Sequence, residues 1–127
     1  MSADWQQWLL VAAGGALGGA LRYTISGWVA QRVGETFPWG TLVVNASGAF
    51  LLALLMGSPI FSGAPSNGAW LLLGVGVIGS YTTVSSLSLQ TLSLAREGQV
   101  RVAVAYVGLS VVTGVAAGAL GWWLVRL

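Results

Sequence analysis

The 127-residue sequence contains no cysteine and no histidine, and it carries only five basic and three acidic side chains. Without cysteine it can form neither a disulfide framework nor a thiolate metal site. Without histidine it lacks the commonest metal ligand and proton shuttle. Charged residues make up 6% of the chain, against about a quarter in a soluble domain, so they are too few to cover the surface of a soluble fold.

The composition excludes two further classes of protein. Disordered chains are poor in apolar residues, whereas 56% of this chain is hydrophobic. The net charge of +2 comes from five arginines that form no cluster, so nucleic acid is not an expected partner. The sequence therefore predicts an integral, multi-pass protein of the cell membrane, with membrane lipid around it.

Four apolar segments have the length of about 20 residues that a helix needs to cross the hydrocarbon core. They are Leu9–Trp28, Trp39–Met56, Ala69–Leu94 and Val102–Val125. Backbone polar groups in lipid must be satisfied within a segment, and no alternating ten-residue strand pattern appears. The sequence thus predicts an all-α membrane protein with one four-span domain over residues 1–127. Because Asp4 precedes the first span without any basic residue, we expect mature structure there and no signal peptide.

Tryptophans and arginines agree with these limits. All seven tryptophans fall at the predicted membrane interfaces, where amphipathic rings are favoured. The first and third loops hold Arg32, Arg96 and Arg101, whereas the side with both termini and the second loop holds Arg126 alone. This bias favours cytoplasmic first and third loops. A bias of this size also allows a chain that inserts in both orientations.

Arg22 is the one charged residue inside a predicted span. It lies six residues from the end of that span, or about 9 Å at 1.5 Å per residue, so its side chain could extend to the interface. Alternatively, it places a positive charge at the mouth of an anion path, because charges inside the membrane usually face protein or a water-filled cavity. The sequence leaves both interpretations open.

Glycines at four-residue spacing favour close helix packing. The pairs are Gly14/Gly18, Gly15/Gly19 and Gly114/Gly118. A different glycine motif, Gly76 and Gly79, directly precedes a polar run.

Residues 79–93 contain eight Ser and Thr hydroxyls, one Tyr and one Gln at membrane depth. One helical stripe of this run consists of Thr82, Ser86, Gln90 and Ser93. The free backbone groups of a broken helix are tolerated in a membrane only where they are buried in protein or line a cavity. We therefore predict that the third helix is broken near its middle, at Gly79–Thr83.

Polar residues also share one face on each of two other helices. Thr41, Asn45 and Gly48 share a face of the second helix, and Tyr106 and Ser110 share one on the fourth. Neutral donors near one arginine suit a small anion, because an anion that loses its water must receive N–H and O–H donors in return. The pattern predicts an anion path in which Asn45 supplies an amide.

Three motifs resemble those of the small dual-topology fluoride channels, the Fluc family. The first runs from Gly15 to Tyr23 (GALGGALRY), the second from Pro38 to Gly48 (PWGTLVVNASG) and the third from Gly76 to Ser85 (GVIGSYTTVS). They come in the order and spacing of that family, and the four-span layout covers the whole chain.

The resemblance implies a fluoride-selective channel that exports fluoride and reduces its cytoplasmic level. It implies an antiparallel dimer with two pores and a structural Na⁺ at the dimer centre, held by the backbone carbonyls of Gly79 and Thr82. Arg22 would lie in the vestibule. The pore-lining positions would be Thr41, Asn45, Val84, Ser85, Leu87, Ser88, Tyr106 and Ser110.

The third motif departs from the family pattern at the pore. Val84 and Leu87 stand where the family has two phenylalanines, and Gln90 stands where it has a glutamate. A ring edge carries partial positive charge that can meet an anion, and an aliphatic side chain does not. Two alternatives follow. The chain is either a fluoride-conducting channel, alone or with a partner, in which Asn45 and the hydroxyls suffice, or a non-conducting structural subunit that forms a heterodimer with a paralogous, phenylalanine-bearing four-span subunit.

A third class, the proton-coupled small multidrug exporter, matches the length and number of spans. Its mechanism needs a membrane-embedded carboxylate, and Asp4, Glu35 and Glu97 all lie outside the predicted spans. An enzyme is not expected either, because the chain offers no nucleophile–base pair and no metal cluster.

Overall fold

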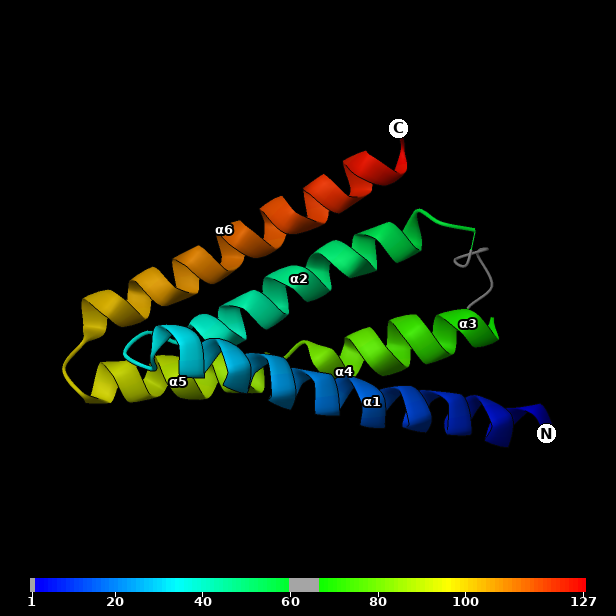
Figure 1. Cartoon of the computed structure of the whole chain (residues 1–127), viewed down its shortest axis with the longest axis horizontal. Helices are drawn as coiled ribbons and strands as arrows, with labels where there is room; N and C mark the ends of the chain where they lie inside the picture. Colours follow the sequence, from blue (N-terminus) through cyan, green and yellow to red (C-terminus); the bar gives the residue numbers. More distant parts are fainter. Residues whose placement is uncertain (1, 60–66) are drawn as a thin grey trace.

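The computed structural model describes residues 2–59 and 67–127, which are mostly helical and contain no strand (Figure 1). The helices are α1 (Ser2–Val33), α2 (Trp39–Met56), α3 (Gly68–Trp70), the π-helix η1 (Leu71–Ile78), α4 (Gly79–Tyr81), α5 (Ser85–Arg96) and α6 (Val100–Val125). By length and composition, four helical stretches can cross a membrane: Asp4–Val33, Trp39–Met56, Gly68–Arg96 and Val100–Val125. The prediction of an all-α, four-span membrane protein is confirmed.

The bounds of three spans differ from the predicted ones. The first helix is 32 residues long and ends at Val33, five residues beyond the predicted Trp28, because polar residues at its end continue the helix past the apolar segment. The third stretch begins at Gly68 and ends at Arg96, and the fourth helix begins at Val100. The second helix begins and ends where it was predicted. Most of the second loop, Gly57–Gly68, lies outside the described residues.

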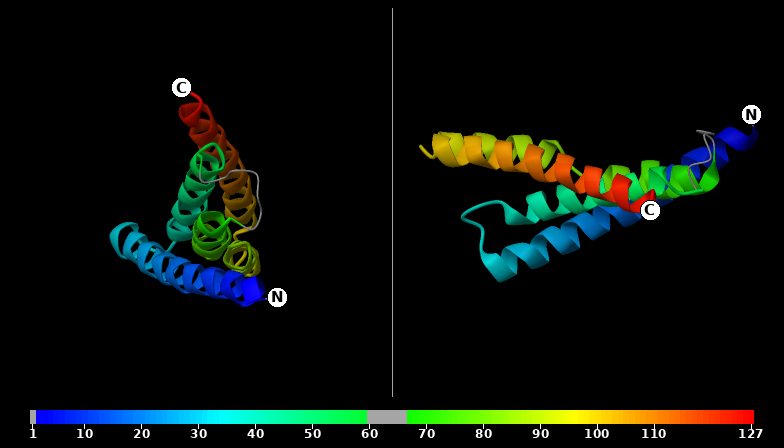
Figure 2. Two further views of the ribbon diagram at one scale, coloured as in Figure 1. Left: turned by 90° about the vertical axis from the view of Figure 1, so that its right-hand side faces the viewer. Right: turned by 90° about the horizontal axis from the view of Figure 1, so that it is seen from above.

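The chain folds as a bundle with both termini at one end and the first and third connections at the other (Figure 1). α2 packs along α6, while α1 packs along η1 and α4 and also contacts α2. α5 packs on α6. Viewed from above, the α1–α2 end diverges from the α5–α6 end (Figure 2). The two halves of the third stretch therefore contact different helices.

The third stretch is broken between α4 and α5, as predicted. Tyr81 ends α4, and Thr82 has the extended backbone angle ψ of 157°. Ser85 begins α5. The break at residues 82–84 overlaps the C-terminal part of the predicted Gly79–Thr83, whereas Gly79 itself is still helical. The π-helix before it was not predicted from the sequence.

Glycine allows α1 to lie against η1 at backbone distance. A Cβ at Gly14 would lie 2.9 Å from the Cα of Gly76, and a Cβ at Gly18 would overlap the carbonyl oxygen of Val77. The predicted role of this glycine pair in packing is confirmed. A Cβ at Gly19 or Gly114 would meet nothing within 4 Å, so packing within the chain does not require glycine at those two positions.

Few large side chains are buried within the chain, and many apolar ones face outward. Val44 and Tyr106 are the large fully buried side chains. Outward-facing apolar residues occur on every long helix, with Leu89 64% and Val115 69% exposed. A soluble monomer rarely exposes so much apolar surface, so lipid or a second protein chain must cover it.

We expect Gly18→Ala to lower thermal stability in detergent, because its methyl group would overlap the Val77 carbonyl, and overpacking costs about 1–3 kcal/mol. Gly19→Ala on the same helix is the matched control, since both changes gain the same helix propensity of about 1 kcal/mol. Melting temperatures followed by circular dichroism would measure the difference. Equal melting temperatures for the two variants would contradict the packing account.

Candidate functional site

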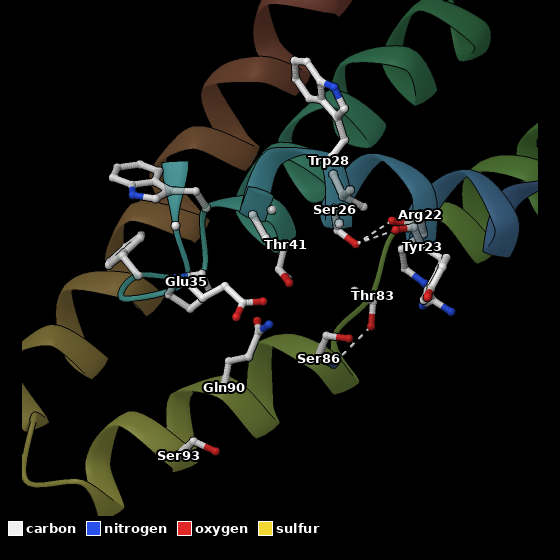
Figure 3. A pocket seen from close by; sticks show the side chains of 18 of the residues that line it. Arg22, Tyr23, Ser26, Trp28, Glu35, Thr41, Thr83, Ser86, Gln90 and Ser93 are labelled. Carbon is white, nitrogen blue, oxygen red and sulfur yellow. Dashed lines mark hydrogen bonds between the residues drawn. The ribbon is translucent and has the colours of Figure 1, made fainter. Parts of the chain in front are cut away.

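A cavity of about 1070 Å³ opens between α1, the α1–α2 connection and α2 on one side and α5 on the other (Figure 3). Its wall includes Arg22 and Ser26 from α1, Thr41 from α2, and Ser86 and Gln90 from α5. Most of these groups are neutral hydrogen-bond donors. The cavity therefore offers a polar surface at the end of the bundle where α1 and α5 diverge.

Arg22 is half-buried and lines this cavity. Its helix continues to Val33, so it lies eleven residues from the helix end, about 16 Å at 1.5 Å per residue. The Ser26 hydroxyl donates to the backbone carbonyl of Arg22 at 2.6 Å. Arg22 thus lies beside a polar cavity, and its role in an anion path stays a prediction.

The side chain of Asn45 holds the broken backbone of the third stretch. Its Nδ2 donates to the carbonyl oxygen of Thr83 at 2.8 Å, and its Oδ1 accepts from the Thr83 N–H at 2.7 Å. Gly48, one turn later on α2, leaves room for the Thr82 methyl group, which a Cβ there would overlap. Asn45 therefore replaces the helical hydrogen bonds that Thr83 lacks, a role that the sequence did not predict for it.

Hydroxyl groups stabilise both sides of the break. Thr83 Oγ1 accepts from the Ser86 N–H at 3.1 Å and so satisfies a free donor at the start of α5. On the other side, the Tyr81 and Ser47 hydroxyls lie 2.9 Å apart. Thr82 Oγ1 donates to the Ile78 carbonyl at 3.1 Å. Of the predicted stripe, Ser86, Gln90 and Ser93 line the cavity, whereas the Thr82 hydroxyl turns back to its own helix.

Tyr106 is fully buried beside the cavity. Its hydroxyl donates to Gln90 Oε1 at 2.7 Å, and its ring meets the Phe37 ring edge-to-face with centroids 5.3 Å apart. One turn further along α6, the Ser110 hydroxyl is buried without a hydrogen-bond partner in the described part of the chain. A buried hydroxyl without a partner is costly, which marks Ser110 as a position where a polar partner is missing.

The structure brings some of the predicted pore positions together. Arg22, Thr41 and Ser85 line the cavity. Asn45 lies behind the cavity wall at the break, and Leu87 packs against the buried cluster of Leu94, Ala103 and Tyr106. The remaining positions lie on other surfaces: Val84 and Ser88 are exposed, and Ser110 faces protein.

Free carbonyl oxygens occur where Na⁺ ligands were predicted. Because Thr83 donates its N–H to Asn45, no hydrogen bond from the described residues reaches the carbonyls of Gly79 and Thr82. Hard cations favour such oxygen ligands. The described residues contain no cluster of three or more His, Cys, Asp or Glu side chains. The oxygen atoms at the break are those of backbone carbonyls and of the Thr82, Thr83 and Ser85 hydroxyls, and Na⁺ binding there stays a prediction.

Sequence reasoning missed several residues of the cavity, among them Thr83 and Glu35. Thr83 belongs to the polar run, but its place in the wall depends on the extended backbone at the break. Glu35 follows the end of α1 and reaches the cavity because the first connection folds over its mouth (Figure 3). No local sequence pattern signals that placement.

The chain is similar to proteins of one family over nearly its whole length. The family model described as "CrcB-like protein, Camphor Resistance (CrcB)" matches residues 9–122. A protein of Rhodopseudomonas palustris (strain BisB18) named fluoride-specific ion channel FluC 2 is 47% identical over 124 residues, covering 94% of this chain and 92% of that protein. A fluoride-specific ion channel FluC of Thermus thermophilus is 46% identical over 119 residues, with 94% and 93% coverage. The protein of the same name from Rhodospirillum rubrum is 52% identical over 108 residues, 83% of each chain.

We expect Asn45→Leu to destabilise the break, because it keeps a side chain of similar size but leaves the Thr83 N–H and carbonyl unpaired, at about 1–3 kcal/mol for each group. Hydrogen exchange at the Thr83 amide should accelerate by at least about tenfold, with a lowered melting temperature. Ser47→Ala is the matched control on α2, since it removes the contacts of the Ser47 hydroxyl with the Tyr81 hydroxyl and the Val44 carbonyl but leaves Thr83 untouched. Unchanged Thr83 exchange in Asn45→Leu would show that the break is held by other contacts.

Proposed function

The chain belongs to the CrcB-like family, and from this premise we propose that it is a fluoride-specific ion channel, or a subunit of one, in a cell membrane. It provides a path by which fluoride leaves the cell and the cytoplasmic fluoride level falls. It transports an ion and catalyses no reaction. The relatives carry the name of the channel, and the geometry of the chain supports the same function.

The observation that carries the proposal is the composition of the cavity wall. Within the helices, the wall presents Arg22 and neutral donors such as Thr41 and Ser86, and its two carboxylates, Glu35 and Glu97, lie beyond the helix ends. Fluoride is small and strongly hydrated, so it can enter only where hydrogen-bond donors replace its water. A carboxylate at membrane depth, which a proton-coupled exporter needs, does not line this cavity.

The proposed channel is an antiparallel dimer. Two features of the single chain support a second copy or a close relative. Val84 is 75% exposed at the break, where an apolar side chain needs a cover, and the Ser110 hydroxyl is buried without a partner in the described residues. The free carbonyls of Gly79 and Thr82 lie at the same break. Na⁺ held by these oxygens would supply a positive charge that joins two such breaks.

A second candidate function is a non-conducting structural subunit. It is favoured by the aliphatic residues Val84 and Leu87 at positions that the fluoride-channel resemblance assigns to aromatic rings. Leu87 packs into the cluster around Tyr106 and does not line the cavity. The number in the name FluC 2 of the Rhodopseudomonas palustris relative supports the idea that such chains occur beside a second one.

We expect the purified chain alone in liposomes to pass fluoride slowly or not at all, and a phenylalanine-bearing four-span partner to restore flux. The liposomes would hold a potassium gradient, and valinomycin would carry K⁺ out as the counter-ion that accompanies fluoride. A fluoride electrode would measure the efflux, and chloride efflux is the selectivity control. Rapid fluoride efflux from the chain alone would reject the structural-subunit function. No fluoride efflux from either preparation would reject the channel proposal itself.

We expect Val84→Phe with Leu87→Phe to raise fluoride efflux of the homodimer by about tenfold, because each ring edge offers a partial positive charge to the anion. Val84→Leu with Leu87→Met is the matched control, since it changes the side-chain shape without adding a ring. An equal rate for both double variants would mean that ring electrostatics at these positions do not limit permeation.

A further inference from the structure

The side chains that line the cavity include two carboxylates near its entrance. The charged residues that line it are Arg22, Glu35 and Glu97, so two carboxylates oppose one guanidinium. Arg22 belongs to the helical wall, whereas both glutamates lie beyond helix ends, in the α1–α2 and α5–α6 connections. Three arginines lie close to the same two connections without lining the cavity, namely Arg32, Arg96 and Arg101. An anion that enters from this end meets the carboxylates before it meets Arg22.

Of the two carboxylates, we consider Glu35, which like Glu97 has no ion pair among the described residues. Its side chain is exposed and its carboxylate turns toward the cavity (Figure 3). It makes no hydrogen bond or ion pair with another described residue. Arg32, the nearest arginine in sequence, places its guanidinium over the Trp28 ring at 5.0 Å from the centroid and does not pair with the carboxylate.

We propose that Glu35 slows the entry of fluoride into the cavity by electrostatic repulsion, and so sets the dependence of flux on ionic strength. This inference rests on the proposed function, since it concerns the anion that the channel conducts. Its magnitude follows from Coulomb's law, because a unit charge at about 8 Å in water changes the local anion concentration two- to threefold. Low-dielectric walls focus the field and increase the effect.

The chain itself offers a matched control for net charge. Besides Glu35 and Glu97, Asp4 is the remaining acidic residue of the chain. It lies in the first turn of α1, whereas Glu35 follows the other end of that helix. The 32 residues of α1 span about 48 Å, which exceeds the Debye length of about 30 Å at 0.01 M salt. Asp4→Asn and Glu35→Gln therefore remove the same unit of charge, and within one chain only the second change should alter the field in the cavity. Because an antiparallel partner would bring its own N-terminus to this face of the membrane, Glu35→Asp, which keeps the charge at the cavity, is the second control.

The absence of cysteine allows a measurement of this field without any ion conduction. Ser93→Cys places a single thiol on the cavity wall, at an exposed position of α5. In detergent, this thiol would be treated with two methanethiosulfonate reagents in separate reactions. One reagent carries an anionic sulfonatoethyl group and the other a cationic trimethylammonium-ethyl group. At about 0.01 M salt, Glu35→Gln should raise the ratio of the anionic to the cationic rate by about fivefold, and at about 1 M salt the effect should vanish.

Fluoride efflux from liposomes gives the second readout. It is measured with the chain alone or with the chain and its four-span partner, whichever of the two preparations conducts fluoride. Glu35→Gln should raise efflux two- to threefold at low ionic strength and leave it unchanged at high ionic strength. An unchanged reagent ratio, a ratio that Glu35→Asp shifts equally, or an effect that persists at high salt would overturn the proposal. A shifted ratio without faster fluoride efflux would also overturn it, because entry would then not limit flux.

The two readouts separate this inference from the proposed function. If no preparation conducts fluoride but the reagent ratio shifts as expected, the channel function is rejected while the repulsive effect of Glu35 on entering anions is supported. If fluoride flows and Glu35→Gln leaves both readouts unchanged, the channel function stands and the role of Glu35 is rejected.

Discussion

A backbone N–H or carbonyl without a hydrogen bond costs several kcal/mol in hydrocarbon, and the break at Thr82 creates such groups in the middle of a membrane-spanning stretch. The side-chain amide of Asn45 satisfies both backbone groups of Thr83 at 2.7 and 2.8 Å. Thr83 in turn caps α5 through the Ser86 N–H. The direction of α5, and with it the wall of the cavity, therefore depends on one amide side chain of α2.

This arrangement requires α2 to lie close to the break, and small residues make that close approach possible. Gly48 makes room for the Thr82 methyl group, while Gly14, Gly18 and Gly76 let α1 approach η1 at backbone distance. In a membrane, where lipid is as apolar as leucine, such close contact is a main source of helix association. By allowing these close contacts, the glycines set the distance between the Asn45 side chain and the backbone of Thr83.

The fold was largely predictable from the sequence because the bilayer dictates it. A membrane span must be helical and about 20 residues long, so apolar runs located four spans and the polar run located the break. The site was predictable only in part. Thr41 and Ser85 line the cavity, and their place in a pore stays a prediction, whereas Asn45 is bonded to Thr83. Helical periodicity cannot show whether a polar side chain faces an ion or a neighbouring backbone.

The polar residues of one chain do not all line its cavity. Arg22 and Thr41 line the cavity, whereas the Ser110 hydroxyl is buried elsewhere without a partner in the described residues, and the apolar Val84 projects from the break. A second subunit placed over the break would cover Val84 and bring its own polar groups toward the carbonyls of Gly79 and Thr82. This placement would account for the exposure of Val84, and it is the physical reason for proposing that permeation belongs to a dimer.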